Sequence, residues 1–433
     1  MRQLEWNLSA NLLKEYDEKL SRDGIDGERL AARLHEISKI GLTSDGGSHR
    51  TGFSNEEKRA KDLVKGWMKK ARLEIYEDGA GNVFGRLEGK NPKLPSVLSG
   101  SHVDSVPNGG HFDGPLGVLS ALEIVEAWNK EGFQPERSYE VVIFTDEEGS
   151  RFNSGLTGSR AMTGEIEKDV QYTLMDQKNK PFEKVLDEAG LSASAFFEIN
   201  RDLNEISHFV EVHIEQGKLL EQYGQPTGIV SGIAGPLWLD MSFEGEAGHA
   251  GNTPMNDRRD ALVAAGEFIS KIHALPKRVS DTAVATVGKL NVSPNGPNVI
   301  PGEVKLIVDI RDISEDTRDE LADLIIKEAG NTAENYGVSL NYKQTIRVTP
   351  VPIQDEYIDR LEKHLQNHSI EPKLIPSGAG HDALIVGHHL PVSMLFVRSQ
   401  KGISHNPEEW STLNDCVRTI HVLREYIESL TKE

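Results

Sequence analysis

Cysteine is almost absent from this chain of 433 residues, because Cys416 is the single thiol. One thiol excludes an internal disulfide and a zinc cage built from cysteines. Long apolar runs are also lacking, since no stretch approaches the ~18 consecutive apolar residues that indicate a membrane-spanning helix. Basic charge is in deficit, with 48 Lys and Arg against 68 Asp and Glu and a formal net charge of −20. This charge repels phosphate backbones and anionic lipid, so nucleic acid and membrane are poor candidate partners.

The segment 1–7 does not join a basic stretch to an apolar run, as a secretory signal would, and together with the single thiol this predicts a cytoplasmic protein. Apolar residues make up 37% of the chain and charged residues 27%, which is typical of a globular protein. At about 150 residues per domain, the length predicts two or three compact units.

Strands and helices alternate through most of the first half. The segment 1–75 is helical in pattern, and Ser54 followed by Glu57 predicts a capping box at one helix start. Four strands and a helix follow, at 82–87, 96–99, 139–145, 209–213 and 116–128. This alternation predicts a sheet with helices on both faces.

A different order begins near residue 225. The pattern predicts a strand, a helix, two strands, a helix and a strand, at 228–246, 257–273, 283–292, 299–310, 314–336 and 338–346. This βαββαβ order is the split βαβ unit. Helix and strand signals resume after Pro350, so the predicted domains are a catalytic domain at 1–224 and 348–433, interrupted by a smaller domain at 225–347.

Four polar stretches each follow an apolar strand. They are 101–117 (SHVDSVPNGGHFDGPLG), 145–149 (TDEEG), 210–217 (VEVHIEQG) and 404–409 (SHNPEE). Open α/β folds place their sites in loops at the carboxyl ends of strands. Each stretch alone could be an ordinary polar loop. Three adjacent carboxylates at 146–148, however, repel one another beside a sheet unless a cation is present.

Three imidazoles and two carboxylates in these stretches could bind metal: His102, Asp113, Glu148, His213 and His405. Nitrogen and oxygen donors without thiolate suit Zn²⁺, Mn²⁺, Co²⁺ or Ni²⁺. Five protein ligands are too many for one open catalytic ion, but they suit two ions that share a bridging carboxylate and water. Asp104, two residues after His102, is placed to orient that imidazole.

Six motifs carry a resemblance to a known family: 107–118 (PNGGHFDGPLGV), 145–152 (TDEEGSRF), 212–217 (VHIEQG), 248–261 (GHAGNTPMNDRRDA), 378–383 (GAGHDA) and 404–410 (SHNPEEW). They resemble the binuclear metallopeptidase and amidohydrolase superfamily of carboxypeptidase G and the aminoacylases. Within it they are similar to the branch of N-carbamoyl-L-amino-acid hydrolase, β-ureidopropionase and allantoate amidohydrolase. The resemblance implies a zinc-peptidase-like α/β catalytic domain interrupted by a ferredoxin-like domain that serves in dimerisation and as a lid.

The resemblance also implies roles at the metal site. Asp113 would bridge the two ions, with His102 and Glu148 completing one half and His213 and His405 distributed over the two sites. Glu147 would act first as general base and then as general acid, and Asp104 would support His102.

His249 on its own is an ordinary loop histidine. The resemblance implies that the matching position of the small domain donates to the oxyanion of the tetrahedral intermediate, often in the site of a neighbouring subunit. We therefore expect a homodimer.

Substrate selection is expected to depend on groups that bind a carboxylate. Arg311 has the planar fork for bidentate pairing, although an ion pair with a neighbouring aspartate is the alternative. Asn298 and Gln216 could hydrogen-bond a polar substrate. The resemblance places His381 near the pocket.

The leading prediction is a hydrolase with two divalent metal ions per subunit that converts an N-carbamoyl-L-amino acid to the L-amino acid, CO₂ and ammonia. Its partner would be a small carboxylate-bearing ureido or acyl amino acid. Allantoate amidohydrolase is the close alternative, because both substrates carry a ureido group and a carboxylate. A broader acyl-amino-acid hydrolase and a metal-dependent ligand-binding protein are the others, and a retained Glu147 argues against the last.

Overall fold

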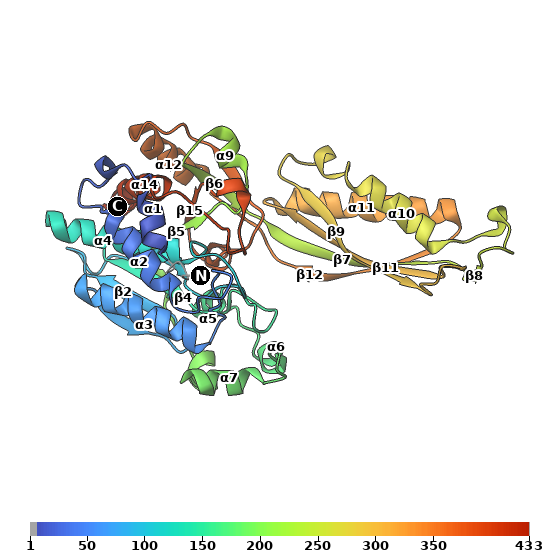
Figure 1. The fold of residues 1–433 in the computed structure, drawn as a ribbon, viewed down its shortest axis with the longest axis horizontal. Helices are drawn as coiled ribbons and strands as arrows, with labels where there is room; N and C mark the ends of the chain where they lie inside the picture. The colour runs from blue at the N-terminus through green and yellow to red at the C-terminus, as the bar shows by residue number, and fades with distance from the viewer. Residues whose placement is uncertain (1–6, 433) are drawn as a thin grey trace, which may run out of the picture. The chain divides into compact units, whose positions relative to one another are not determined.

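Apolar strands build one large mixed sheet in the computed structural model, which describes residues 7–432 (Figure 1). The strands are β1 (Glu74–Glu77), β2 (Val83–Leu87), β3 (Ser96–His102), β4 (Tyr139–Phe144), β5 (Ile206–Ile214), β6 (Thr227–Ile233), β13 (Val351–Pro352), β14 (Leu374–Ser377) and β15 (Val392–Val397). Their order is β1-β2-β4-β3-β5-β15-β6-β13, and β14 pairs with β6. The four central strands β4, β3, β5 and β15 are parallel. Their carboxyl ends therefore meet at one edge of the sheet.

The chain forms two compact units. The first comprises Met1–Val230, Ile353–Ile375 and His381–Glu433, and the second comprises Ser231–Pro352 and Pro376–Gly380. The predicted fold class, an α/β domain interrupted by a smaller domain, is confirmed. The assignment of catalysis to one unit and of dimerisation to the other stays a prediction.

Helices cover both faces of the large sheet. Those of the first unit are α1 (Leu8–Leu13), α2 (Gly27–Ser38), α3 (Asn55–Lys70), α4 (Pro115–Glu131), α5 (Thr157–Thr163), α6 (Lys168–Thr173), α7 (Phe182–Ala189), α8 (Ala193–Phe197), α9 (Leu219–Tyr223), α12 (Asp355–Asn367), α13 (Asp382–Val386) and α14 (Leu413–Thr431). Val210 and Val212 of β5 point into the core shared with α4 and α14. Glu211 between them points to the opposite face and accepts a hydrogen bond from Ala383 N of α13, because successive side chains of a strand alternate between faces.

Two helix starts near the site follow from local sequence. Ser54 caps α3 by accepting from Glu57 N at 3.1 Å, as predicted, but the Glu57 carboxylate accepts from Phe53 N and not from Ser54 N, so only half of the predicted capping box forms. Gly114 precedes α4 with a φ of +80°, and a Cβ there would lie 2.4 Å from the His102 ring. Glycine is therefore required on both conformational and steric grounds.

The second unit has a four-stranded antiparallel sheet of order β12-β7-β11-β9, with α10 and α11 packed on it (Figure 1). Its elements are β7 (Gly235–Glu244), β8 (Gly248–His249), α10 (Ala261–Ile272), β9 (Val284–Ser293), β10 (Val299–Ile300), β11 (Glu303–Asp312), α11 (Glu315–Tyr336) and β12 (Ser339–Arg347). Leaving aside the short pair β8–β10, the order of strands and helices is the predicted βαββαβ.

Two predicted strands are wrong, because each is divided in the structure. The strand expected at 299–310 is β10 and β11, which belong to different sheets. The single strand expected at 228–246 is two strands, β6 and β7, which belong to different sheets. The break falls at Ala234 and Gly235, where a Cβ on the glycine would lie 2.2 Å from the carbonyl oxygen of Val348. A continuous apolar pattern cannot reveal that the chain changes sheets at this point.

In the part of the chain that the structure describes, no helix is long and apolar enough to cross a membrane.

Candidate metal centre

The five predicted ligands lie together at the carboxyl ends of the central strands. His102 ends β3, His213 lies in β5, and Glu148 and His405 lie in the loops after β4 and β15. Asp113 lies just before α4. The adjacent parallel strands β4, β3, β5 and β15 bring these distant segments to one edge of the sheet.

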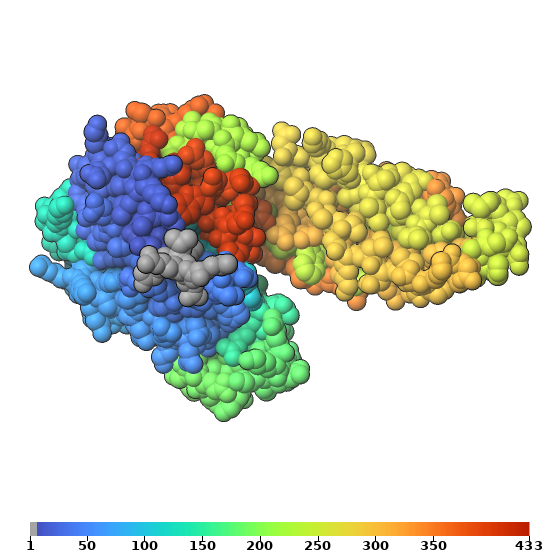
Figure 2. Space-filling model, in the orientation of Figure 1, coloured from blue at the N-terminus to red at the C-terminus, as the bar shows by residue number. Residues whose placement is uncertain are grey.

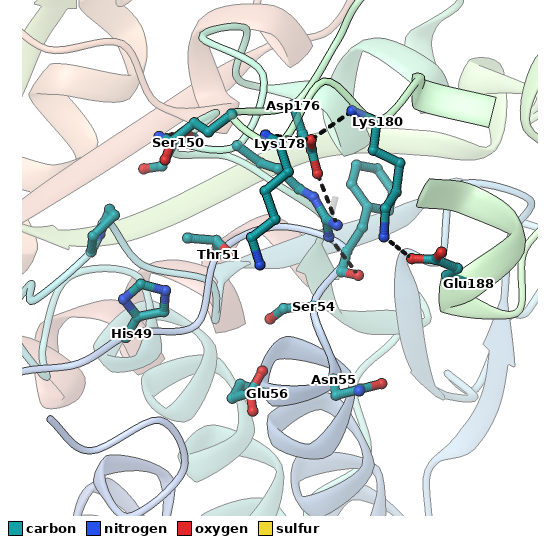
Figure 3. Close-up of a pocket in the computed structure, with 14 residues that line it drawn as sticks. His49, Thr51, Ser54, Asn55, Glu56, Ser150, Asp176, Lys178, Lys180 and Glu188 are labelled. Carbon is teal, nitrogen blue, oxygen red and sulfur yellow. Dashed lines mark hydrogen bonds and ion pairs between the residues drawn. The ribbon is translucent and has the colours of Figure 1, made fainter. Parts of the chain in front are cut away.

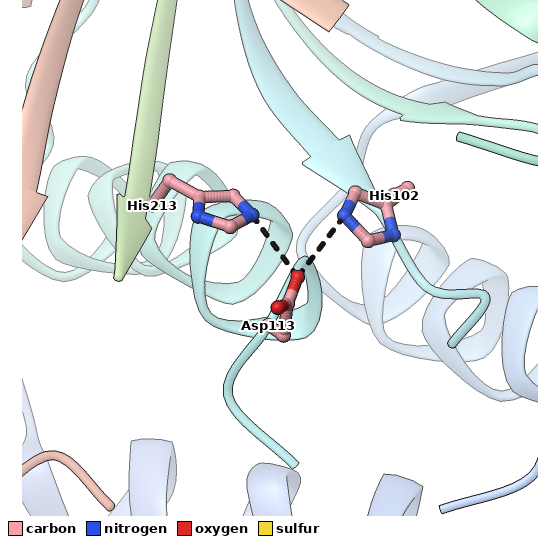
Figure 4. Close-up of side chains that lie close together, drawn as sticks. All are labelled: His102, Asp113 and His213. Carbon is pink, nitrogen blue, oxygen red and sulfur yellow. Dashed lines mark ion pairs between the residues drawn. The ribbon is translucent and has the colours of Figure 1, made fainter. Parts of the chain in front are cut away.

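Asp113 is shared by two groups of potential ligands. Its Oδ1 lies 3.2 Å from His213 Nε2 and 3.6 Å from His102 Nε2 (Figure 4). Its Oδ2 lies 3.5 Å from His405 Nε2, which is 3.3 Å from Glu148 Oε2. Within each group the ligand atoms lie within 4.8 Å of one another. The side chains group His102 with His213 and Glu148 with His405 around Asp113. This division differs from the one that the resemblance implied, and the assignment of each residue to an ion stays a prediction.

The buried nitrogens fit a metal site. His102 Nδ1 lies 3.2 Å from the carbonyl oxygen of Asp104, and His213 Nδ1 lies 3.0 Å from that of Ile214. These contacts favour a proton on each Nδ1, which leaves the Nε2 lone pairs facing Asp113. His102 Nε2 is buried and has no hydrogen-bond partner among residues 7–432. A cation bound here would accept the Nε2 lone pairs and balance the charge of the carboxylate. Imidazoles that bind metal commonly donate their other N–H to a carbonyl oxygen, as these two can.

Carboxylates crowd the same edge. Burial, reinforced by neighbouring carboxylates, raises the pKa of Glu147 and that of Glu148 well above the ordinary value. Burial also opposes ionisation of Asp113, but His213 and His102 hold its pKa well below the ordinary value. Buried carboxyl groups crowded at one edge of a sheet fit a site whose charge is completed by a cation.

Asp104 connects the first group to the paired glutamates. Its Oδ1 accepts a hydrogen bond from Glu147 N and its Oδ2 accepts one from Glu148 N, each at 3.2 Å. The same Oδ1 lies 3.4 Å from His102 Nδ1. Glu147 Oε2 lies 3.6 Å from His102 Nε2. The fully buried Asp104 thus contacts one imidazole and holds the backbone that carries both glutamates, and its support of His102 stays a prediction.

Two predicted substrate-binding residues contact the ligands themselves. Gln216 Nε2 donates to Asp113 Oδ2 at 2.8 Å and to Ser404 Oγ at 3.3 Å. The buried ring of His381 lies 4.4 Å from the ring of His213. Both residues lie at the metal cluster, and their roles toward a substrate stay predictions.

The remaining predicted residues belong to the second unit. His249 and Asn298 are exposed and close in the β8–β10 region, where Ala250 N donates to the carbonyl oxygen of Asn298 at 3.0 Å. Arg311 makes the ion pair weighed as an alternative, with its Nε at 3.0 Å and its Nη2 at 2.9 Å from the Asp309 carboxylate. Its Nη1 donates to the carbonyl oxygen of Gly378.

Three polar side chains at the cluster were not predicted. Ser404 Oγ donates to Asp113 Oδ2 at 2.7 Å, and Glu409 accepts from Asp113 N at 3.1 Å. Glu211 accepts from Ser101 Oγ at 2.7 Å. A signal existed for each, because Ser404 and Glu409 share a motif with His405, and Glu211 is an acidic residue inside an apolar strand.

A cavity of about 390 Å³ opens beside the loops that follow β3 and β4 (Figure 3). Two of its cations are paired, Arg151 with Asp176 and Lys180 with Glu188. Figure 3 shows Lys178 extending toward the space. None of the five predicted ligands lines this cavity, so the candidate site is defined by the ligand cluster.

The chain matches the model of Peptidase family M20/M25/M40 over residues 98–429. It is 43% identical over 399 residues to the N-carbamoyl-L-amino acid amidohydrolase of Geobacillus stearothermophilus, covering 92% of this chain and 97% of that one. It is 34% identical over 421 residues to allantoate deiminase 1 of Glycine max, covering 90% and 86%. The solved amidase of the hydantoinase/carbamoylase family from Burkholderia multivorans is 33% identical, with a TM-score of 0.88 and coverage of 94% and 98%.

The chain therefore belongs to Peptidase family M20/M25/M40. Within that family it is similar to enzymes named for hydrolysis of carbon–nitrogen bonds in small ureido compounds. The resemblance carried by the six motifs is confirmed.

Proposed function

We propose that the chain is a metal-dependent amidohydrolase of N-carbamoyl-L-amino acids. With one water molecule it would convert each substrate to the L-amino acid, CO₂ and ammonia. Two groups of ligands that share Asp113 carry the proposal of a hydrolytic metal site. The greater identity to the carbamoyl amino acid enzyme than to allantoate deiminase supports the substrate class.

The donor set supports two divalent ions per chain. Asp113, His102 and His213 would hold one ion, and Asp113, Glu148 and His405 would hold the other. Imidazole and carboxylate donors suit zinc, manganese, cobalt or nickel. The chemistry that such ions supply when bound is to acidify a water molecule and to polarise a carbonyl group.

Glu147 is the proposed proton carrier. Its carboxylate lies beside His102, and Asp104 holds its backbone nitrogen. Glu147 would accept the proton of the attacking water and return it to the departing nitrogen. A positioned general acid–base group contributes on the order of 10²–10⁴-fold. Burial raises the pKa of Glu147, which is the direction that favours return of the proton.

Four side chains are proposed to select the substrate. Arg311 would exchange Asp309 for the substrate carboxylate, which it can bind in the same bidentate geometry. Asn298, Gln216 and His381 would line the polar part of the substrate site. His249 would donate to the oxyanion, which requires a donor already in place.

Exposed apolar side chains support a homodimer through the second unit. Leu262 and Val263 of α10 and Val284 and Leu290 of β9 are all more than a third exposed. β9 is the edge of the described four-stranded sheet, so its outer backbone groups can pair with a second copy. In Figure 2 the segment that carries these elements is yellow.

Dimerisation is tested by size-exclusion chromatography with light scattering, in which Leu290→Lys should shift the protein from dimer to monomer. Glu147→Gln and His249→Ala chains that are refolded together test whether His249 of one subunit acts in the site of the other. If His249 acts in the partner's site, the mixed dimer regains activity that neither variant has alone.

A substrate panel tests the proposed reaction. Purified protein with Mn²⁺ is incubated with N-carbamoyl-L-methionine, allantoate and N-acetyl-L-methionine, and both ammonia and methionine are measured. Equal release of ammonia and methionine from the carbamoyl compound is the expected result. Turnover of allantoate alone would identify the alternative enzyme, and methionine from the acetyl compound alone would identify an acyl-amino-acid hydrolase.

A further inference from the structure

Glu409 is a buried carboxylate in the same loop as His405, and it is not one of the five proposed ligands. Its Oε1 accepts hydrogen bonds from Phe112 N at 2.9 Å and from Asp113 N at 3.1 Å. Its Oε2 lies 3.0 Å from Ser404 Oγ. One side chain thus ties the segment that carries Asp113 to the segment that carries His405, although the two are almost 300 residues apart.

Ser404 extends this connection to the shared carboxylate. Its Oγ donates to Asp113 Oδ2 at 2.7 Å, the oxygen that faces His405. A hydroxyl carries one proton, so it can donate fully to one acceptor at a time. The partner on the other side, Glu409 Oε2, therefore helps to determine how Ser404 is oriented toward Asp113.

The loop before Asp113 is shaped to admit this carboxylate. A Cβ on Gly110 would lie 2.0 Å from Glu409 Cδ. Contacts of that length do not occur, so any side chain at position 110 must displace the carboxylate or the loop. Gly110 and Glu409 therefore offer two independent ways to disturb the same contact.

We propose that Glu409 is a positioning residue for the bridging carboxylate of the metal centre. It holds the backbone of Asp113 directly and the Oδ2 atom through Ser404, and so fixes Asp113 relative to Glu148 and His405. This inference rests on the proposed function, in which those residues bind metal. Loss of a group that orients a ligand typically lowers metal affinity by about 10–100-fold.

The contact geometry separates positioning from a simple effect of charge. Glutamine at position 409 keeps an oxygen for the two backbone N–H groups, and its amide can donate to Ser404 Oγ. Glu409→Gln should therefore preserve metal affinity within a few fold. If Glu409 acted through its negative charge, the same substitution would weaken cation binding as much as alanine does.

Metal binding to the chelator-treated, metal-free protein tests the inference. Wild type and variants are titrated with Mn²⁺ by equilibrium dialysis, and bound metal per chain is measured by mass spectrometry. Glu409→Ala and Gly110→Ala should each lower the affinity for one of the two ions by about 10–100-fold. Glu408→Ala is the matched control, because Glu408 is the adjacent, exposed glutamate, and it should bind as wild type does.

Wild-type affinity for both ions in Glu409→Ala would overturn the inference, and so would equal losses in Glu409→Gln and Glu409→Ala. Circular dichroism and the melting temperature of each metal-free variant verify the fold. Where alanine at 409 fails to fold, the glutamine and Gly110 variants decide the question. A wild-type protein that binds no Mn²⁺ would instead contradict the proposed function.

Discussion

Replacing Lys61 by methionine should destabilise the protein through one buried ion pair. Lys61 Nζ lies 2.8 Å from Glu57 Oε1 and donates to Thr145 Oγ1 at 2.7 Å and to the carbonyl oxygen of Gly81 at 3.1 Å. The side chains of Lys61 and Glu57 are 8% and 3% exposed. Methionine fills a similar volume but leaves the Glu57 carboxylate buried without its cation. Such a loss costs about 3–5 kcal/mol.

The same pair supports the loop that carries the proposed base. Glu57 Oε1 also accepts a hydrogen bond from Asp146 N at 3.3 Å, one residue before Glu147. The double variant Lys61→Met with Glu57→Gln should lose less than the sum of the single losses, because no unpaired charge remains. Lys65→Met is the matched control, since Lys65 pairs with half-exposed carboxylates and should cost under about 1 kcal/mol.

Urea denaturation of the metal-free proteins, followed by tryptophan fluorescence, measures these losses from midpoints and slopes. Burial raises the pKa of Glu57, and Lys61 opposes that rise. Without Lys61 the folded-state pKa rises further above the unfolded value, so the folded protein takes up a proton more readily as the pH falls. The deficit of Lys61→Met should therefore be smaller at pH 5.5 than at pH 8. Two results would refute the reasoning. One is a loss of free energy of unfolding below about 1 kcal/mol at pH 8, which is less than a broken buried pair should cost. The other is strict additivity of the two single losses in the double variant.

Three further predictions concern other parts of the molecule. Glu147→Gln should lower kcat by about 10²–10⁴-fold with unchanged metal content, and unchanged turnover would remove the proposed base. Arg311→Ala should raise KM for carboxylate substrates more than for their carboxamide analogues, and equal losses on both would indicate a folding role. Burial lowers the pKa of His208 to about 3, so the unfolded chain binds the proton more tightly and stability falls as the pH drops below about 6.5. The wild type should therefore lose about 2 kcal/mol of free energy of unfolding between pH 7 and pH 5, and His208→Phe should not show this loss. Urea denaturation at both pH values measures it, and the same pH dependence in the variant as in the wild type would contradict the prediction.

The positions of the ligands were predictable because each is tied to a local pattern. His102 and His213 lie at the end of apolar strands, and Glu148 and His405 follow such strands within a loop rich in polar residues. Parallel strands with polar carboxyl ends form sites at one edge of a sheet. A local signal of this kind needs no knowledge of which strands are neighbours.

The division of the ligands into two groups was not predictable, because it depends on strand order. His102 faces His213 because β3 pairs with β5, and no pattern within either strand encodes that pairing. The contact of Glu409 with Asp113 N depends on packing between residues almost 300 positions apart. Gln216 shows the same limit, since its motif predicted a polar role but not its hydrogen bond to Asp113.

Metal stoichiometry across three variants tests the central claim most directly. Chains reconstituted with Mn²⁺ and freed of excess metal are analysed for bound metal per chain. Wild type should retain two ions, His102→Ala and His405→Ala one each, and Asp113→Ala neither, because Asp113 alone belongs to both groups. Two ions retained by Asp113→Ala, or none by the wild type, would contradict the account.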